Sequence, residues 1–200
     1  MNIEVKQYNS EDFNYNNDTL EQFLPLFSAY AQIVSNGKEG KNLAIEDLVK
    51  NMPNENDKKY AEQALIHQML DHIADDSKVF VLNRDSKPVS FAIYSNKDKN
   101  DQKYILELVY TIEKEQGRGF AKQLLLESFK ELKKDALSVL AHVEDGNYAS
   151  LELNKSLGTI HFEQIDSKGS IDIEHIINDE LANVVRRRQA QKQQETEKEI

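Results

Sequence analysis

Residues 116–121, with the sequence Gln-Gly-Arg-Gly-Phe-Ala, join an apolar run at residues 104–112 to a helical pattern at residues 122–132. The apolar run predicts a strand, and the spacing of the leucines and phenylalanines that follow predicts a helix. Gly117 and Gly119 lack a Cβ atom, so the backbone can turn sharply and bring its N–H groups close to a ligand. The first turn of a helix adds N–H groups without intrahelical acceptors. Together these features predict a turn that binds an anion such as a phosphate.

Strand and helix patterns also alternate along the rest of the chain. Runs rich in β-branched and aromatic residues predict strands at residues 2–8, 79–82, 89–94, 104–112, 137–143, 161–165 and 170–177. Apolar residues at helical spacing predict helices at residues 18–35, 44–50, 58–74, 122–132 and 149–157. The chain becomes charged and glutamine-rich after residue 178, with a helical start. We therefore expect one domain at residues 1–177 and a charged C-terminal tail at residues 178–200.

Charge and composition limit the classes of partner and chemistry. A net charge of −10 disfavours binding to nucleic acid, which depends on a basic surface, and favours cationic partners such as amines. The absence of cysteine excludes disulfides and thiolate chemistry, and the histidines are not spaced as metal ligands, so we predict no metal site. The sequence contains neither an apolar run long enough for a membrane span nor a leader pattern. We expect a cytoplasmic protein with no membrane partner.

The order of these elements and two local motifs resemble the GNAT family of N-acetyltransferases. In that family a Q/R-x-x-G-x-G/A segment after the fourth strand binds the pyrophosphate of acetyl-coenzyme A, and residues 116–121 match every defined position. About thirty residues later the family has an asparagine that opens a helix ending in leucine-glycine, and Asn147, Leu153, Leu157 and Gly158 resemble these positions. The resemblance implies an α/β (α+β) fold, with a mixed, mostly antiparallel, twisted sheet of about seven strands flanked by helices.

The resemblance also implies a cosubstrate and the residues that hold it. The cosubstrate is acetyl-coenzyme A, and an amine attacks its thioester directly, without a covalent enzyme intermediate. The backbone of residues 109–111 is expected to pair with the pantetheine arm, and the glycine turn with the phosphates. The implied coenzyme-binding residues are Val109, Tyr110, Thr111, Gln116, Gly117, Arg118, Gly119, Phe120, Ala121, Lys122 and Asn147.

Two positions bear on the mechanism. Glu107 interrupts an apolar run, where burial is expected to raise the pKa of its carboxyl toward the range of a general base. It is the candidate catalytic residue, although a carboxylate that pairs with a lysine or faces solvent is an equal alternative. The family often places a tyrosine, which protonates the leaving thiolate, seven residues after the motif asparagine. Here that position is Asn154, which cannot supply a proton near neutral pH.

The sequence leaves three functions open. The first is an N-acetyltransferase that acts on a primary amine, with the acceptor a small amine, an aminoglycoside-like compound, a protein N-terminus or a lysine. The second is a non-catalytic acyl-coenzyme A-binding or regulatory module, which the departure at Asn154 suggests. The third is an interaction protein whose tail forms the partner surface. A homodimer is compatible with each of them.

Overall fold

The computed structural model describes residues 2–9, 12, 77–96 and 102–198. The helices predicted at residues 18–35, 44–50 and 58–74 lie outside these residues and stay predictions. The described elements are β1 (Ile3–Asn9), β2 (Lys78–Arg84), β3 (Lys87–Ser95), β4 (Lys103–Thr111), the 3-10 helix η2 (Glu113–Glu115), α4 (Phe120–Leu132), β5 (Ser138–Val143), α5 (Tyr148–Ser156), β6 (Ile160–Ile165), β7 (Ile171–Ile176) and α6 (Asp179–Lys198).

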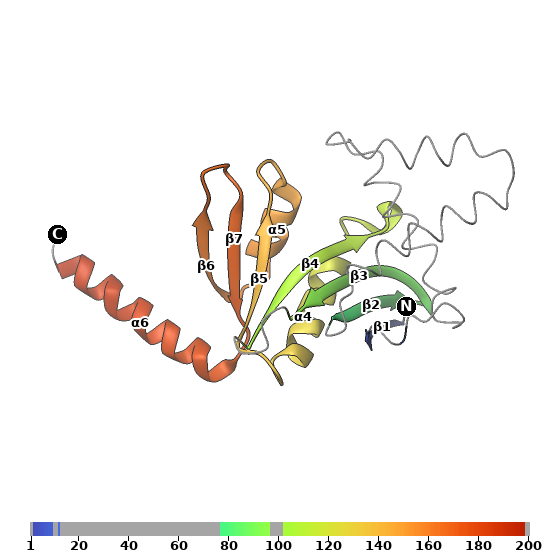
Figure 1. The fold of residues 1–200 in the computed structure, drawn as a ribbon, viewed down its shortest axis with the longest axis horizontal. Coiled ribbons are helices and arrows are strands. Elements are labelled where there is room, and N and C mark those ends of the chain that lie inside the picture. The colour runs from blue at the N-terminus through green and yellow to red at the C-terminus, as the bar shows by residue number, and fades with distance from the viewer. Residues whose placement is uncertain (1, 10–11, 13–76, 97–101, 199–200) are drawn as a thin grey trace, which may run out of the picture.

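The strands form one seven-stranded sheet in the order β1-β2-β3-β4-β5-β7-β6. All seven predicted strands are present, each within two residues of its predicted bounds. Every neighbouring pair is antiparallel except β4 and β5, which are parallel because α4 carries the chain back between them. This mixed, mostly antiparallel sheet with flanking helices confirms the fold class that the sequence predicts (Figure 1).

Helix α4 packs its apolar side against the sheet and forms the main core of the described chain. Leu124 and Leu125 are fully buried there, in a cluster with Phe80 and Tyr94 from the strands. The hydroxyl groups of Tyr94 and Ser128 form a buried hydrogen bond between β3 and α4, and burial raises the pKa of the tyrosine. The core therefore fixes α4 on the sheet, with its N-terminus near the end of β4.

The sheet has two arms that meet at a short junction. Strands β4 and β5 pair over only four residues each, and the last pair is Leu106–Ala141. Beyond it the two strands diverge, so that β1–β4 form one arm and β5, β7 and β6 form the other (Figure 1). The divergence opens a space in the middle of the sheet that no strand fills among the described residues.

An extra residue bends β4 at the same point. Leu106 pairs with Tyr94 of β3 and Leu108 pairs with Ile93, so Glu107 has no counterpart in the register of β3. A bulge of this kind bends a strand and increases its local twist. The bulge thus lies at the point where β4 leaves β5.

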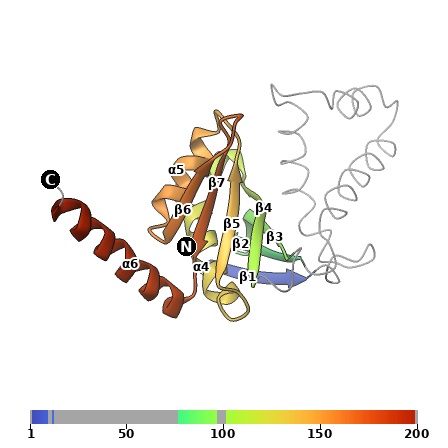
Figure 2. The same cartoon turned by 60° about the vertical axis from the view of Figure 1, so that its left-hand side comes forward.

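The C-terminal helix α6 extends away from the sheet at the end of β7 (Figures 1 and 2). Asn178 caps it, because its Oδ1 atom accepts the backbone N–H groups of Glu180 and Leu181, each at 3.1 Å. Ala182 is buried near its start. None of the helices in the described part of the chain combines the length and apolar composition needed to cross a membrane.

Candidate functional site

A cleft of about 760 Å³ lies where β4 and β5 diverge. Its walls come from β4, the glycine turn, the first turn of α4, the end of β5 and α5. The structure brings together eleven of the twelve site residues predicted from the sequence, and Arg118 is the exception. The eleven are Glu107, Val109, Tyr110, Thr111, Gln116, Gly117, Gly119, Phe120, Ala121, Lys122 and Asn147.

The glycine turn has the backbone geometry that the sequence predicts. Gly117 has a φ of 72° and Gly119 a φ of 81°, both in the left-handed region that side chains disfavour. A Cβ atom on either glycine would meet no atom within 4 Å, so both face open space. Gly119 is also the N-cap of α4 and offers no side chain to the first N–H groups of the helix. These donors are therefore left for a ligand.

Hydrogen bonds fix the end of β4 next to this turn. The Nε2 atom of Gln116 donates to the carbonyl oxygen of Thr111 at 3.0 Å. The hydroxyl of Ser90 donates to the carbonyl oxygen of Tyr110 at 2.8 Å and also bonds the hydroxyl of Thr111 at 2.8 Å. The turn and the strand therefore hold a defined geometry before any ligand arrives.

Arg118 does not line the cleft. Its guanidinium lies 3.3 Å from the carboxylate of Glu115, which also pairs with Arg84 at 2.5 Å. The side chain of Glu115 is only 6% exposed, and a buried carboxylate requires charged or hydrogen-bonding partners. The structure thus gives Arg118 a partner that the sequence did not indicate, and a phosphate contact for it stays a prediction.

Asn147 begins α5 at the far wall of the cleft. Its Oδ1 atom accepts the backbone N–H of Ser150 at 3.1 Å, which is an N-cap bond. Asn147 therefore orients the first turn of α5 toward the cleft as well as lining it.

Asn154 belongs to a buried polar network. Its Nδ2 atom donates to the carbonyl oxygen of Ser150 at 2.8 Å, and its Oδ1 atom accepts from Nε2 of His175 at 2.9 Å. The other ring nitrogen of His175 bonds the hydroxyl of Thr159 at 2.6 Å. Asn154 is 1% exposed and His175 is fully buried. Asn154 thus links α5 to β7, and its amide is committed to structure.

Glu107 is placed differently from the sequence prediction. Its side chain is exposed, so the burial that the apolar run suggested is wrong, because the bulge and the end of the β4–β5 ladder open this part of the strand. Its carboxylate accepts a hydrogen bond from the hydroxyl of Ser95. Its role in catalysis stays a prediction.

Sequence reasoning missed His142, which lies on β5 and lines the same cleft. Its Nδ1 atom is 2.7 Å from Oδ1 of Asp172 on the neighbouring strand β7. The available signal was a polar residue within the apolar run 137–143, which is the signal that singled out Glu107 on β4.

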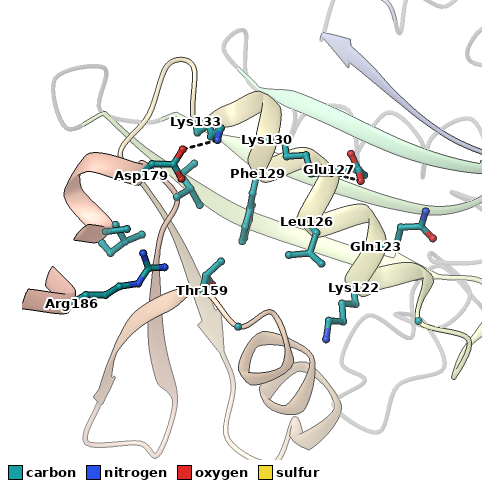
Figure 3. Close-up of a pocket in the computed structure, with 15 residues that line it drawn as sticks. Lys122, Gln123, Leu126, Glu127, Phe129, Lys130, Lys133, Thr159, Asp179 and Arg186 are labelled. Carbon is teal, nitrogen blue, oxygen red and sulfur yellow. Dashed lines mark hydrogen bonds and ion pairs between the residues drawn. The ribbon is translucent and has the colours of Figure 1, made fainter. Parts of the chain in front are cut away.

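A second cavity of about 530 Å³ lies between α4, the start of α6 and the segment around Thr159 (Figure 3). Gly119 and Lys122 line both spaces. Figure 3 shows Lys122 and Arg186 extending toward this cavity from α4 and α6. Lys133 is paired with Asp179 at 2.9 Å, which ties the two helices together. Lys122 therefore places a positive charge between the glycine turn and this cavity.

Comparisons with known proteins place the chain in a family. The model of the acetyltransferase (GNAT) family matches residues 42–159, so the chain belongs to the GNAT acetyltransferases. This membership confirms the resemblance seen in the sequence. A comparison by sequence with curated proteins gives no match.

Solved structures show the same fold at low sequence identity. The paiA N-acetyltransferase of Thermoplasma acidophilum, in complex with coenzyme A, is 16% identical, with a TM-score of 0.58 over 88% of this chain and 99% of that one. The structure of yncA from Salmonella typhimurium with acetyl-CoA is 15% identical, with a TM-score of 0.54 over 88% and 95%. The ribosomal-protein-alanine N-acetyltransferase of Brucella melitensis is 20% identical, with a TM-score of 0.51 over 86% and 99%.

Proposed function

We propose that the protein is an N-acetyltransferase that transfers the acetyl group of acetyl-coenzyme A to a primary amine in a ternary complex. The cleft supports this proposal, because one space contains the glycine turn, the start of α4 and the part of β4 that β5 does not follow. An anionic head and an extended amide-containing arm are the two parts of the ligand that such a space suits.

The residues of the cleft fit each part of the coenzyme. The N–H groups of the glycine turn and of the first turn of α4 would hold the pyrophosphate, with Lys122 supplying a positive charge. The backbone of residues 109–111 would pair with the pantetheine amides in the manner of an added strand. Asn147 on the opposite wall can add a side-chain contact. Side-chain identity matters little for the strand pairing, because backbone groups make it.

Acetyl transfer then requires little more than orientation and proton transfer. The protein must bring the amine to the thioester carbonyl, accept a proton from the ammonium and stabilise the oxyanion that develops. A backbone N–H of β4 is the candidate donor to that oxyanion. Asn154 cannot protonate the thiolate, because its amide is an internal hydrogen-bonding group. We propose that water protonates the thiolate or that it leaves unassisted.

Two measurements test the proposal in sequence. Calorimetry should show that acetyl-coenzyme A binds, and absence of binding would reject both this function and the non-catalytic alternative. A thiol reagent should then report release of coenzyme A across a panel of amines. The chain has no cysteine, so the protein itself contributes no thiol signal.

Replacing Glu107 with glutamine is expected to lower the rate of acetyl transfer at neutral pH, measured at a fixed, subsaturating amine concentration. The carboxylate lines the cleft, where it can accept a proton from the ammonium or attract it. The affinity for acetyl-coenzyme A should change little, because the predicted phosphate contacts lie in the glycine turn, beyond the end of β4. An unchanged rate would remove Glu107 from the mechanism.

The second candidate function is an acyl-coenzyme A-binding module without efficient transfer. The buried network of Asn154 favours it, since the position where the family often has an acid is structural here. Binding of acetyl-coenzyme A without thiol release on any amine of the panel would support this alternative over the enzyme.

A further inference from the structure

Two polar side chains lie on the two strands that border the opening of the sheet. Leu106 and Ala141 form the last pair between β4 and β5, and both belong to the core under α4. Successive side chains of a regular strand alternate between faces, so His142, which follows Ala141 on β5, points to the opposite face. On β4 the bulge interrupts this alternation, but Glu107 accepts a hydrogen bond from Ser95, which follows the core residue Tyr94 on β3, and so lies on that opposite face as well. Both residues line the cleft. The opening is thus flanked by a carboxylate and an imidazole.

A carboxylate on the next strand fixes the imidazole. His142 pairs with Asp172 across the β5–β7 ladder, and its Nδ1 atom lies 2.7 Å from Oδ1 of Asp172. A carboxylate only accepts hydrogen bonds, so Nδ1 carries the proton and the neutral ring keeps a lone pair on Nε2. The side chains of His142 and Asp172 are 54% and 49% exposed, so a substrate can reach the ring.

We propose that His142 is the general base of the reaction and that Asp172 is its positioning residue. This inference rests on the proposed acetyl transfer. Imidazole is the side chain that ordinarily changes charge between pH 5 and 8, so it can both accept and release a proton near neutrality. Glu107, on the other side of the opening, then attracts the substrate ammonium and does not remove its proton.

The proton balance of the step is complete. The ammonium gives one proton to Nε2 of His142, and the free amine attacks the carbonyl carbon of the thioester to form a C–N bond. The tetrahedral intermediate collapses with cleavage of the C–S bond, and the thiolate of coenzyme A leaves. The nitrogen loses its second proton through water, which protonates the thiolate. His142 returns its proton to solvent.

The charges around His142 favour a cationic acceptor. Asp172 pairs with the ring, Glu107 lines the same cleft on β4, and Glu144 follows the end of β5. Lys103 at the start of β4 is paired with a carboxylate, because Glu174 lies 3.0 Å from it. Burial opposes ionisation of Glu174, but hydrogen bonds from Ser138 and Lys103 outweigh it and lower the pKa of this carboxyl. The acceptor side of the opening therefore carries several carboxylates in the described part of the chain, which suits an ammonium.

The test uses the full chain, acetyl-coenzyme A and the amine that the unmodified protein acetylates fastest. The panel contains a linear polyamine, an aminoglycoside, a lysine peptide and a peptide with a free N-terminus. H142Q is expected to lower kcat by about 100-fold to 10,000-fold. D172N should lower kcat by about tenfold or more, because the ring loses the acceptor that fixes its tautomer. Affinity for acetyl-coenzyme A should be unchanged in both variants.

The matched control for D172N is E174Q. It removes the same charge from the same strand and face, at a carboxylate that pairs with Lys103 and Ser138 and does not bond His142. E174Q should leave kcat and the shape of the pH profile as they are. Circular dichroism and coenzyme binding show whether each variant is folded.

The pH profile separates a base from a structural histidine. The kcat of the unmodified protein should fall as the pH drops through the range where imidazoles gain a proton, and H142Q should lose this fall. Hydroxylamine is uncharged at neutral pH, so the loss of rate in H142Q should be smaller with it than with an ammonium substrate. E107Q should raise the KM for the amine more than it lowers kcat.

The outcomes distinguish the two proposals. If the unmodified protein releases no thiol on any amine, the proposed function is wrong and this inference falls with it. If the protein acetylates an amine and H142Q keeps both kcat and the acidic limb of the profile, His142 is not the base, although the proposed function stands. Loss of activity in E174Q equal to that in D172N would show that only the charge of this face matters.

Discussion

Replacing Gly119 with alanine is expected to raise the dissociation constant for acetyl-coenzyme A by about tenfold or more, equivalent to about 1.4 kcal/mol. Gly119 lines the cleft, has a φ of 81° and has open space where a Cβ atom would stand. The added methyl group would occupy the space proposed for the pyrophosphate. A residue with a Cβ atom also disfavours a positive φ, so alanine would favour other backbone conformations that turn the N–H groups of the turn away from the ligand. Calorimetry measures the change directly.

Gly146 provides the matched control for this prediction. It has the same φ of 81°, and a Cβ atom there also meets nothing within 4 Å. It does not line the cleft. Both G119A and G146A should lose about 1 kcal/mol of stability through backbone strain, but only G119A should lose coenzyme affinity. Equal affinity losses would show that the glycine turn is not the phosphate site.

Replacing Leu124 with alanine is expected to lower the free energy of unfolding by about 2–5 kcal/mol. Leu124 is fully buried in the cluster between α4 and the sheet. Truncation removes the free energy gained by burying the leucine side chain away from water. It also leaves a cavity, which the sheet and α4 can close only in part because the surrounding core holds both in place. Urea unfolding, followed by circular dichroism, measures the loss.

Leu126 is the control, because it lies on the same helix and undergoes the same change in helix propensity. It is only partly buried, at the edge of the core, and lines the second cavity, between α4 and α6. L126A should cost less than half the stability that L124A costs. Equal losses would contradict the placement of the α4 core.

The strands and α4 were predictable because their signals are local. Each strand is an apolar or β-branched run bounded by turn residues, and both glycines of the turn are needed for a positive φ. The parallel pairing of β4 with β5 follows from the helix that connects these two strands. The bulge at Glu107 was not predictable, because nothing in the run at residues 104–112 indicates an extra residue. The exposure of Glu107 follows from that bulge and from the divergence of β5.

Partners distant in the sequence account for most of the other differences in the site. Arg118 pairs locally with Glu115, but Glu115 is held in place by Arg84 of β2. His142 acquires its carboxylate from β7, thirty residues later. Interactions of this kind depend on strand order and register, which the sequence alone does not specify. The domain limits at residues 177 and 178, the homodimer and the cytoplasmic location stay predictions.

The short junction between β4 and β5 leads us to expect that bound coenzyme stabilises the whole protein. Only four residue pairs join the two strands, so a ligand held by both arms of the sheet would add to the contacts that the junction and the core under α4 make between them. A ligand at 100 times its dissociation constant adds about 2.7 kcal/mol to stability. We expect the protein to resist proteolysis when acetyl-coenzyme A is plentiful and to be degraded faster when it is scarce. Abundance of the enzyme would then follow the supply of its own cosubstrate.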